Sequence, residues 1–370
     1  MNRILIVPNS FKECANSVDT ALLIKENFTD SRFKIILKPV SDGGDGFLEV
    51  CRENYDLEIR PCEISSPYSN DKIICKIGAD KTGKTVYVES AKVLGLNLIP
   101  PGKRKPMELN SKGLGEVFNF VQQKYPSAEK VIIGIGGTGT NDLGLGAAGV
   151  FGLRLLDADG NNLEIIPRNY IKAHQLVWKN PILPFKFEII VDVDNSLLGE
   201  TGAAKTFAKQ KGASDDDIEV MEKGFANILN LLKGNDLLSS SKKLNGAGGG
   251  LAAGLQVFFN AEIKYANNFI LADLNVKDIS PEDLIVITGE GKFDSQSLMN
   301  KAPGIIIENF KDSQAQVFVI CGIAEENIEN KISGNVKVIE MKKYFSSAEE
   351  SIKNFTSGLQ KACSEIKNFL

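Results

Sequence analysis

Acidic side chains stand beside glycines in three segments of this sequence, and two of these segments also contain lysines. Residues 38–47 read KPVSDGGDGF, residues 191–204 read VDVDNSLLGETGAA, and residues 286–304 read VITGEGKFDSQSLMNKAPG. Each segment begins in or follows an apolar run that is typical of a buried strand. Carboxylates bind Mg²⁺ or accept a hydroxyl proton, and lysines neutralise anionic groups. The pattern therefore favours magnesium-assisted phosphoryl transfer, in which a protein mainly positions reactants and neutralises charge.

The residues that could carry this chemistry fall into two sets. We predict one lysine and four acids as catalytic, each acid being a candidate for binding Mg²⁺ or for accepting the hydroxyl proton: Lys12, Asp42, Asp192, Glu290 and Asp294. We predict that three further side chains bind substrate or neutralise transferred charge: Ser10, Lys292 and Lys301. The sequence leaves open which acid is the base. For any one of these segments alone, a solvated acidic loop is the ordinary explanation.

Two glycine-rich segments are predicted to bind phosphate. Residues 134–139 (GIGGTG) follow an apolar run, and residues 246–250 read GAGGG. Glycines let the backbone approach a phosphate, and a helix N-terminus attracts negative charge. The predicted phosphate- or nucleotide-binding residues are Gly136, Gly137, Thr138, Asn141, Asp142 and Gly248. Asn141 and Asp142 also stand where a helix would start, so that an N-cap is a second interpretation of them.

The same GIGGTG segment supports a different class of enzyme. It fits the G-x-G-x-x-G pattern of dinucleotide-binding proteins, and Asp157 and Asp159 follow about 20 residues later, where a ribose-binding acid would stand. An NAD-dependent oxidoreductase is therefore the main alternative.

Residues 78–85 (GADKTGKT) match the phosphate-binding pattern G-x-x-x-x-G-K-[ST], but the strand-like VYVES follows them where that pattern needs a helix. We predict a hairpin turn there.

Composition excludes several other functions. His174 is the only histidine in 370 residues, so the chain cannot form a multi-histidine zinc site. The formal net charge of −4 argues against a nucleic-acid partner. No apolar window approaches the length of a membrane span, and no signal peptide is recognisable. The cysteines are scattered, as in a reduced protein, so we predict a cytoplasmic location.

Strand and helix patterns indicate two α/β domains. Buried strands are predicted at 3–9, 34–40, 283–291, 316–324 and 336–341, and helices at 15–29, 301–311, 325–331 and 346–369, the last with Ile352, Phe355, Leu359 and Ile366 inward. Between them, alternating segments at 56–64, 71–78 and 85–91 predict an antiparallel meander, and further strands are expected at 131–137 and 187–195. We predict one domain from residues 1–55 and 280–370, a second inserted at 56–279, and a site in the cleft between them.

Taken together, these motifs resemble the bacterial glycerate kinase family of the glycerate 2-kinase type. The matching segments are PNSFK (8–12), DGGDG (42–46), GGTGTNDLG (136–144), DVDNSLLG (192–199), QKGA (210–213), GAGGGLAAGL (246–255), ITGEGKFDSQ (287–296) and KAP (301–303). They keep the family's order and spacing from residue 1 to at least 340. The chain departs from the family's residues at Asn9, Leu143, Ser196 and Asn300, where the family has Asp, Gly, Pro and Gly.

The resemblance implies a fold, an activity and its cofactors. It implies a flavodoxin-like domain with a second α/β domain, and the transfer of a phosphoryl group from ATP, with Mg²⁺, to D-glycerate to give 2-phosphoglycerate. The partners would be ATP and glycerate or a similar hydroxy acid, and the sequence leaves open whether the chain is a homo-oligomer. Because Asn9 and Leu143 depart from the family, a non-catalytic ligand-binding relative is a third alternative.

Overall fold

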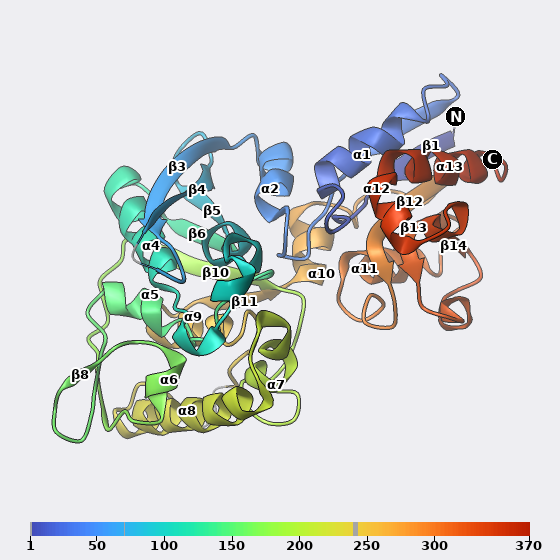
Figure 1. Ribbon diagram of the computed structural model, residues 1–370. Helices are drawn as coiled ribbons and strands as arrows, with labels where there is room; N and C mark the ends of the chain where they lie inside the picture. Colours follow the sequence, from blue (N-terminus) through green and yellow to red (C-terminus); the bar gives the residue numbers. More distant parts are fainter. Residues whose placement is uncertain (1, 70, 240–242) are drawn as a thin grey trace. The chain divides into compact units, whose positions relative to one another are not determined.

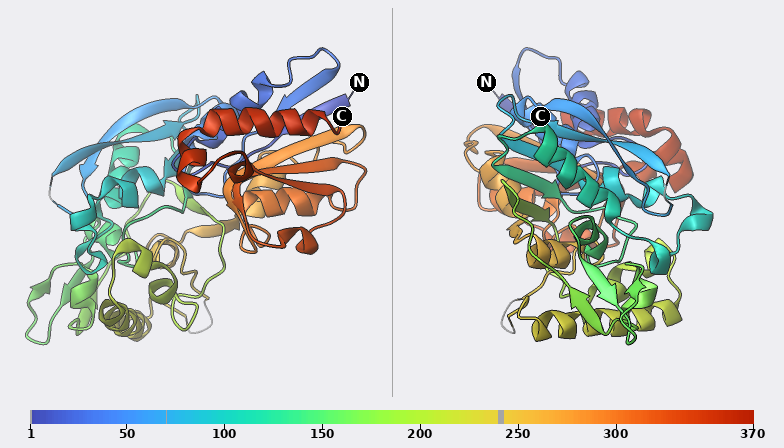
Figure 2. Two further views of the ribbon diagram at one scale, coloured as in Figure 1. Left: turned by 45° about the vertical axis from the view of Figure 1, so that its right-hand side comes forward. Right: turned by 90° about the vertical axis from the view of Figure 1, so that its left-hand side faces the viewer.

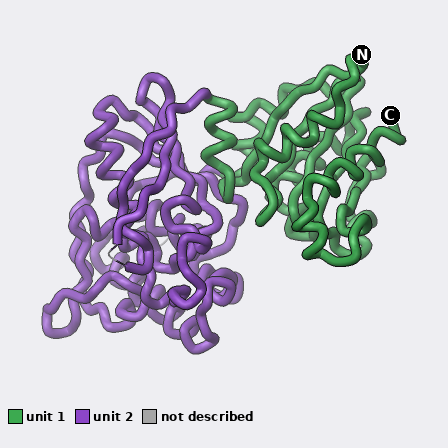
Figure 3. The backbone as a smooth tube through the Cα atoms, turned by 45° about the horizontal axis from the view of Figure 1, so that its top comes forward, with its two compact units in different colours: residues 1–55, 265–370 green, residues 56–264 purple. Residues whose placement is uncertain are grey.

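The computed structural model describes residues 2–69, 71–239 and 243–370 (Figures 1 and 2). The chain forms two compact units, which Figure 3 colours separately. Unit 1 combines Met1–Tyr55 with Tyr265–Leu370, and unit 2 comprises Asp56–Lys264. Within the three described ranges, no helix is both long and apolar enough to cross a membrane.

Unit 1 is built on a five-stranded sheet in which all neighbouring strands are parallel. The strands are β1 (Asn2–Ile6), β2 (Phe33–Leu37), β12 (Leu284–Phe293), β13 (Gln316–Ala324) and β14 (Val336–Glu340). Their spatial order is β2-β1-β12-β13-β14. Counted along this unit, that is the order 2-1-3-4-5 of flavodoxin-like folds. The predicted α/β fold with a flavodoxin-like sheet made from both ends of the chain is confirmed.

Helices cover both faces of this sheet. On one face, α1 (Ser17–Glu26) and α13 (Phe355–Lys367) pack over alternate strand residues, and Ile4, Ile6, Ile24 and Leu359 share one buried cluster. On the sheet's other side lies α11 (Ala302–Phe310), whose Ile306 and Phe310 are buried (Figure 1). The remaining helices of this unit are α2 (Phe47–Tyr55), α10 (Ala266–Asn268), η5 (Phe269–Asp273), η6 (Ile328–Lys331), η7 (Met341–Tyr344) and α12 (Ala348–Lys353). Burial on both faces explains why the strands are continuous apolar runs.

Two predicted helices differ from the structure. The segment 346–369 is not one helix, because Asn354, with φ −106° and ψ 32°, separates α12 from α13. The break turns Ile352 outward, to 44% exposure, whereas Phe355, Leu359 and Ile366 are buried as expected. The segment 325–331 holds only the short 3-10 helix η6, since Asn327 takes a left-handed φ of 60° directly before it.

Unit 2 is built on a six-stranded mixed sheet with the order β11-β10-β6-β5-β4-β3. The strands are β3 (Glu58–Ser65), β4 (Lys72–Ala79), β5 (Thr85–Glu89), β6 (Lys130–Gly134), β10 (Lys186–Val191) and β11 (Glu262–Tyr265). The predicted meander is confirmed, because β4 pairs antiparallel with both β3 and β5. The predicted hairpin turn is also confirmed, because Asp80 accepts backbone N–H groups from Thr82, Lys84 and Thr85. GADKTGKT is therefore no phosphate loop.

The rest of unit 2 consists of helices and a second, small sheet. The sequence patterns did not predict this small sheet. This second sheet has the order β8-β7-β9, from β7 (Arg154–Leu156), β8 (Asn162–Leu163) and β9 (Gln175–Val177). Its strands are only two or three residues long, too short for an alternation to be recognised. The helices are α3 (Ser90–Leu94), η1 (Leu96–Leu98), η2 (Pro101–Lys103), η3 (Pro106–Glu108), α4 (Lys112–Lys124), α5 (Leu145–Val150), α6 (Pro167–Tyr170), α7 (Ala203–Phe207), η4 (Lys209–Lys211), α8 (Asp215–Gly234) and α9 (Leu251–Phe258).

The chain returns to unit 1 earlier than the predicted residue 280. Unit 2 ends at Lys264, and the segment from Tyr265 packs with unit 1. Phe269 packs against Phe47 with ring centroids 5.3 Å apart, and the Tyr55 hydroxyl donates to the carbonyl oxygen of Asp273 at 3.1 Å. These contacts bind residues 265–273 to α2, which precedes unit 2 in the chain.

Candidate active site

The unit 1 sheet reverses its strand order between β1 and β12. In open α/β sheets, ligands bind at such a point, outside the carboxyl ends of the strands. Two backbone-linked segments leave the sheet there: Asn9 donates its N–H to the Gly289 carbonyl at 2.9 Å, and the Thr288 hydroxyl donates to the Val7 carbonyl at 2.9 Å. The PNSFK and TGEGKFD segments therefore run side by side, and the carboxyl ends of β1 and β12 carry predicted site residues together.

Asp42 is held at the same edge by Asn9. The Asn9 Nδ2 donates to Asp42 Oδ2 at 2.9 Å, and Asn9 is 6% exposed. Asp42 opens the DGGDG turn after β2, in which Gly43 and Gly46 have φ values of 101° and 87°. Such left-handed conformations favour glycine, which explains the glycines of this turn. The turn leads directly into α2, so that the Asp42 carboxylate stays beside the end of β1.

Glu290 is the most buried acid of this edge. Its side chain is 7% exposed, and its Oε1 has no hydrogen-bond partner within the described ranges. Burial raises the pKa of Glu290 to about 7, and the Asp42 and Asp294 carboxylates add to the rise, while Ser297 and Lys301 oppose it. A carboxyl group with such a pKa changes its protonation near neutral pH, as a general base or acid must.

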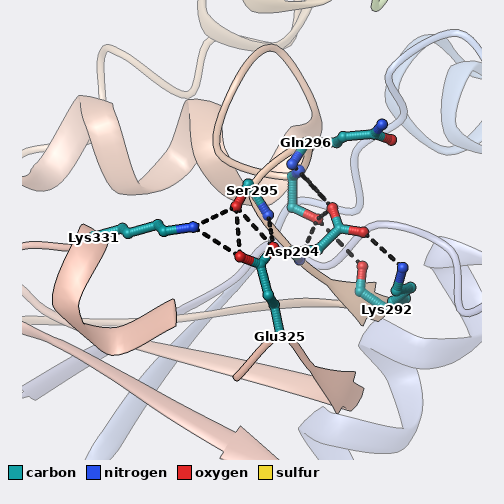
Figure 4. Close-up of polar contacts among 7 residues, drawn as sticks. Lys292, Asp294, Ser295, Gln296, Glu325 and Lys331 are labelled. Carbon is teal, nitrogen blue, oxygen red and sulfur yellow. Dashed lines mark hydrogen bonds and ion pairs between the residues drawn. The ribbon is translucent and has the colours of Figure 1, made fainter. Parts of the chain in front are cut away.

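Asp294 lies in a tightly bonded loop directly after β12 (Figure 4). Its Oδ1 accepts the backbone N–H groups of Gln296 and Ser297 at 3.0 and 3.2 Å, and its Oδ2 pairs with Lys292 Nζ at 3.0 Å. These bonds outweigh desolvation and lower the pKa of Asp294 below its usual value. Asp294 therefore stays ionised where Glu290 readily takes up a proton.

Glu325 fixes the other side of this loop. Its carboxylate accepts the Ser295 backbone N–H at 2.7 Å and the Ser295 hydroxyl at 2.7–2.8 Å, and it pairs with Lys331 Nζ at 2.7 Å (Figure 4). The pair with Lys331, followed by the bonds from Ser295, lowers the pKa of Glu325 to about 2. Sequence reasoning missed this role, because Glu325 follows β13 and lies outside every motif.

The predicted basic residues of unit 1 differ in exposure. Lys12 is exposed and its backbone N lies 3.5 Å from the position that a Cβ on Gly291 would take. The Lys292 side chain is 72% exposed, and Lys301 is half-buried at the N-cap of α11. All three therefore lie at or near the carboxyl end of β12, and Lys301 acts electrostatically on both Glu290 and Asp294.

In unit 2, the two glycine-rich segments meet. Gly136 and Gly137 follow β6, and Ser90 holds Gly136 by donating to its carbonyl and accepting from its N–H at 3.0 and 3.1 Å. The Thr138 hydroxyl donates to the carbonyl of Gly248 at 3.0 Å. Helix α5 begins only at Leu145, so the glycines of GIGGTG do not open a helix as a dinucleotide fingerprint requires.

Asp142 is a structural anchor in this loop. Its buried carboxylate accepts the N–H and hydroxyl of Ser111, each at 2.7 Å, and the N–H groups of Gly144 and Gly146 at 3.3 and 3.0 Å. Desolvation by burial nevertheless raises its pKa. The N-cap of α5 is Gly144, so neither Asn141 nor Asp142 takes the N-cap position that the second interpretation gave them. Asp142 instead accepts N–H groups from Ser111 and from the backbone around the start of α5.

The structure divides the predicted site residues between the two units. Unit 1 holds Ser10, Lys12, Asp42, Glu290, Lys292, Asp294 and Lys301, and unit 2 holds Gly136, Gly137, Thr138, Asn141, Asp142, Asp192 and Gly248. Asp192 follows β10, beside β6, and is therefore in the same unit as the glycine-rich turns rather than with the other predicted acids.

The acids of unit 1 suit a magnesium ion that takes most of its ligands from elsewhere. Among the described residues, no three His, Cys, Asp or Glu side chains converge closely enough to hold a metal ion by themselves. Mg²⁺ is usually bound by one or two carboxylates together with water and substrate phosphates. The unpartnered Glu290 Oε1 and the ionised Asp294 fit that smaller contribution.

The Asn9→Asp substitution, which introduces the residue of the resembled family, tests the geometry around Asp42. It would replace the Asn9 Nδ2 donor, 2.9 Å from Asp42 Oδ2, by a second carboxylate. Two carboxylates at this distance cannot both ionise without repulsion. In metal-free buffer we expect the free energy of unfolding to fall by about 1–3 kcal/mol at pH 8 and by clearly less at pH 5. Denaturant titrations at both pH values measure this, and an equal loss at both would contradict it.

Comparisons with known proteins agree with these features. The family model described as the glycerate kinase family matches residues 4–370. The glycerate 2-kinase of Escherichia coli K12 is 32% identical over 335 residues, covering 88% of this chain and 86% of that protein. The glycerate kinase of Neisseria meningitidis serogroup B is 30% identical over 375 residues, covering 100% and 98%. A crystal structure assigned as glycerate kinase 2 from Salmonella typhimurium LT2 superposes with a TM-score of 0.76 at 25% identity, covering 99% and 97% of the two chains.

Proposed function

We propose, from the premise that this chain belongs to the glycerate kinase family, that it transfers the γ-phosphoryl group of ATP to the 2-hydroxyl of D-glycerate. Membership of the family supports a kinase that acts on glycerate. The position of the phosphorylated hydroxyl is proposed from the E. coli relative, which is a glycerate 2-kinase. ATP as donor and Mg²⁺ as cofactor are part of the proposal.

One observation carries the proposal: two acids of opposite pKa shift stand at the switch point of a parallel sheet. The pKa of Glu290 is raised to about 7, mainly by burial, and that of Asp294 is lowered by its bonds to Lys292 and to the loop backbone. Pairs of acids whose environments separate their pKa values commonly divide the roles of proton acceptor and permanent charge. Phosphoryl transfer to a hydroxyl needs both roles.

The proposed reaction distributes charge over the named side chains. The glycerate hydroxyl oxygen forms a bond to the γ-phosphorus, the bond from that phosphorus to the β,γ-bridging oxygen breaks, and ADP leaves. The hydroxyl proton passes to a carboxylate of the Asp42, Glu290 and Asp294 group. Carboxylates of this group would hold magnesium, and the ion, when bound, would neutralise phosphate charge. Lys12, Lys292 and Lys301 are assigned to the negative groups of the substrate and the transferred phosphoryl group.

Incubation with ATP, Mg²⁺ and D-glycerate tests the proposal. We expect ADP to form in proportion to glycerate consumed, and phosphorus NMR to identify 2-phosphoglycerate rather than 3-phosphoglycerate as the product. The absence of ADP formation above background, with D-glycerate and with a panel of small hydroxy acids, would contradict the kinase assignment. Oxidation of a hydroxy acid with reduction of NAD would favour the oxidoreductase instead, and ligand-induced thermal stabilisation without turnover would favour the non-catalytic relative.

A further inference from the structure

A buried lysine that no chemical argument from the sequence singled out lies between the glycine-rich turns of unit 2. Lys211 is 3% exposed, and its Nζ donates to the Thr140 carbonyl at 2.8 Å and to the Thr138 hydroxyl at 3.3 Å. Burial lowers the pKa of Lys211 to about 7, although the Asp142 charge opposes the shift. An ammonium group has three protons to donate, so these two neutral acceptors do not satisfy it.

Two neighbouring side chains share this lack of partners. Asn141 is fully buried, and neither its Nδ2 nor its Oδ1 has a hydrogen-bond partner in the part of the chain that the structure describes. The Thr140 hydroxyl is also buried, and it too has no hydrogen-bond partner among the described residues. Buried polar groups without partners cost stability, and they are uncommon unless something absent from the folded chain satisfies them. Folding alone therefore gives no reason for an asparagine at position 141.

The glycine turn lies directly against these groups. Gly248, Gly249 and Gly250 have consecutive φ values of 66°, 73° and 88°, a backbone conformation that favours glycine. A Cβ on Gly249 would lie 2.7 Å from Lys211 Nζ and 2.8 Å from Asn141 Nδ2. On the accessible side, Gly137 is exposed and Gly136 and Gly248 are half-buried. The turns thus have an open side, and polar side chains that include a lysine lie beneath them as a floor.

No carboxylate neutralises this floor by contact. Within the described ranges no ion pair to Lys211 is present, and Asp142, the acid that acts on it electrostatically, is already bonded to Ser111, Gly144 and Gly146. A buried lysine without a carboxylate partner, beneath backbone that favours glycine, can donate protons to a phosphate oxygen, and the phosphate charge would in turn favour its protonated form.

We propose that Asn141 and Lys211 form the polar floor of a phosphate-binding site at the glycine turns, with Asn141 as a ligand and Lys211 as the positioning charge. The ligand is a phosphoryl group, carried either by the nucleotide or by the phosphorylated product. This inference rests on the proposed function and goes further by assigning roles: Asn141 and Lys211 serve the ligand, and Asp142 serves the fold.

The Asn141→Leu variant separates the ligand role from a structural one. Leucine is similar in size and removes two unsatisfied polar atoms, so we expect the melting temperature to stay equal or to rise. The dissociation constant for a phosphate ligand, measured by calorimetry with ATP, ADP, AMP, adenosine, 2-phosphoglycerate and inorganic phosphate, should increase at least about tenfold for the compounds that occupy this site. Unchanged affinity for all six compounds, or a large loss of stability instead, would overturn the inference.

The Lys211→Met variant tests the charge. The loss of affinity should grow from adenosine, which carries no phosphate, through AMP to ATP if the nucleotide is the ligand. It should appear with 2-phosphoglycerate and not with the nucleotides if the product phosphate is the ligand. A uniform loss across charged and uncharged ligands would show that Lys211 only supports the fold. The exposed Lys209→Met variant, which removes only a surface pair with Asp215, is the control and should match the wild type.

A glycine pair provides a second, independent test. Gly249→Ala would place a methyl group against Lys211 and Asn141, whereas Gly160→Ala imposes a similar strain, at φ 84°, with nothing within 4 Å. We expect Gly249→Ala to weaken phosphate binding at least tenfold more than Gly160→Ala.

These measurements need binding only, so they remain informative if glycerate is not phosphorylated. A protein that binds the phosphate compounds but lacks turnover contradicts the proposed function and not this site. Equal effects of the two alanines would contradict the site alone.

Discussion

The Asp294→Asn variant should retain its fold and lose about 10²–10⁴-fold in kcat for glycerate phosphorylation. Asparagine keeps an oxygen that can accept the N–H groups of Gln296 and Ser297, which Asp294 Oδ1 now accepts at 3.0 and 3.2 Å. The variant loses the negative charge beside Lys292 and Lys301. In the wild type this charge is present throughout the neutral range, because the pKa of Asp294 is lowered. Steady-state kinetics with saturating ATP and D-glycerate, at constant Mg²⁺, measure the loss.

A second aspartate of unit 1 provides a matched control for this prediction. Asp30 accepts the Arg32 backbone N–H at 2.9 Å through one oxygen and pairs with Arg32 Nε at 2.8 Å through the other, which is the same arrangement on the surface. Asp30→Asn should leave kcat and KM unchanged. If Asp294→Asn also left kcat within about threefold of the wild type, at matched thermal stability, Asp294 would not belong to the reacting groups.

The architecture of unit 1 was largely predictable because its signals are local. Parallel strands buried on both faces are continuous apolar runs, and such runs appear in β1, β12 and β13. These runs do not predict the order of the strands in the sheet, because that order depends on how the connecting helices pack against the sheet. The boundary near residue 264 was missed for the same reason: what assigns residues 265–273 to unit 1 is the contact of Phe269 with Phe47, more than two hundred residues away in the chain.

The candidate site was predictable in its residue types and less so in their individual roles. Glycines and acids after strands indicate a ligand-binding edge whichever acid does the chemistry. The roles depend on burial and on partners outside the motifs, such as Asn9 beside Asp42 and Glu325 behind the Asp294 loop. Asp142 illustrates the limit, because a conspicuous acid of a glycine-rich motif proves to be a buried anchor for backbone N–H groups. The buried Lys211 shows the reverse, since a lysine in sequence looks like a solvated surface residue.

The left-handed backbone at Leu143 shows how one departure from the family's pattern is accommodated. Leu143 has a φ of 54°, in the region that favours the glycine of the resembled motif, and it is followed by Gly144 with a φ of 65°. Its side chain is 3% exposed. Burial of a leucine side chain stabilises by about 1.5–3 kcal/mol, and a non-glycine residue in this region costs about 1–3 kcal/mol. The two effects are of similar size, so the loop can keep its shape with leucine at this position.

The Glu290→Gln variant should be more stable than the wild type at pH 8 and much less active. The raised pKa means that folded Glu290 binds a proton at pH values where the unfolded chain has lost it. The stability that protonated Glu290 contributes is therefore complete below about pH 4.5, the pKa of this residue in the unfolded chain. It is lost as the pH rises through about 7, the pKa in the folded protein. A shift of this size corresponds to about 3 kcal/mol at most. Glutamine, which never ionises, escapes that loss.

Denaturant titrations from pH 5 to pH 8 in metal-free buffer measure the difference. The free energies of unfolding of wild type and Glu290→Gln should agree within about 1 kcal/mol at pH 5 and diverge in favour of the variant toward pH 8. The Glu325→Gln control should behave oppositely: because the pKa of Glu325 is lowered to about 2, its bonds to Ser295 and Lys331 stabilise the ionised form, and their loss should destabilise the protein at both pH values. A Glu290→Gln variant that is less stable than the wild type at pH 8 would mean that the Glu290 carboxylate is better satisfied than its unpartnered Oε1 indicates. A gain in stability together with a loss of kcat of about 10²-fold or more would instead identify Glu290 as an acid that the chain keeps for catalysis at a cost in folding free energy.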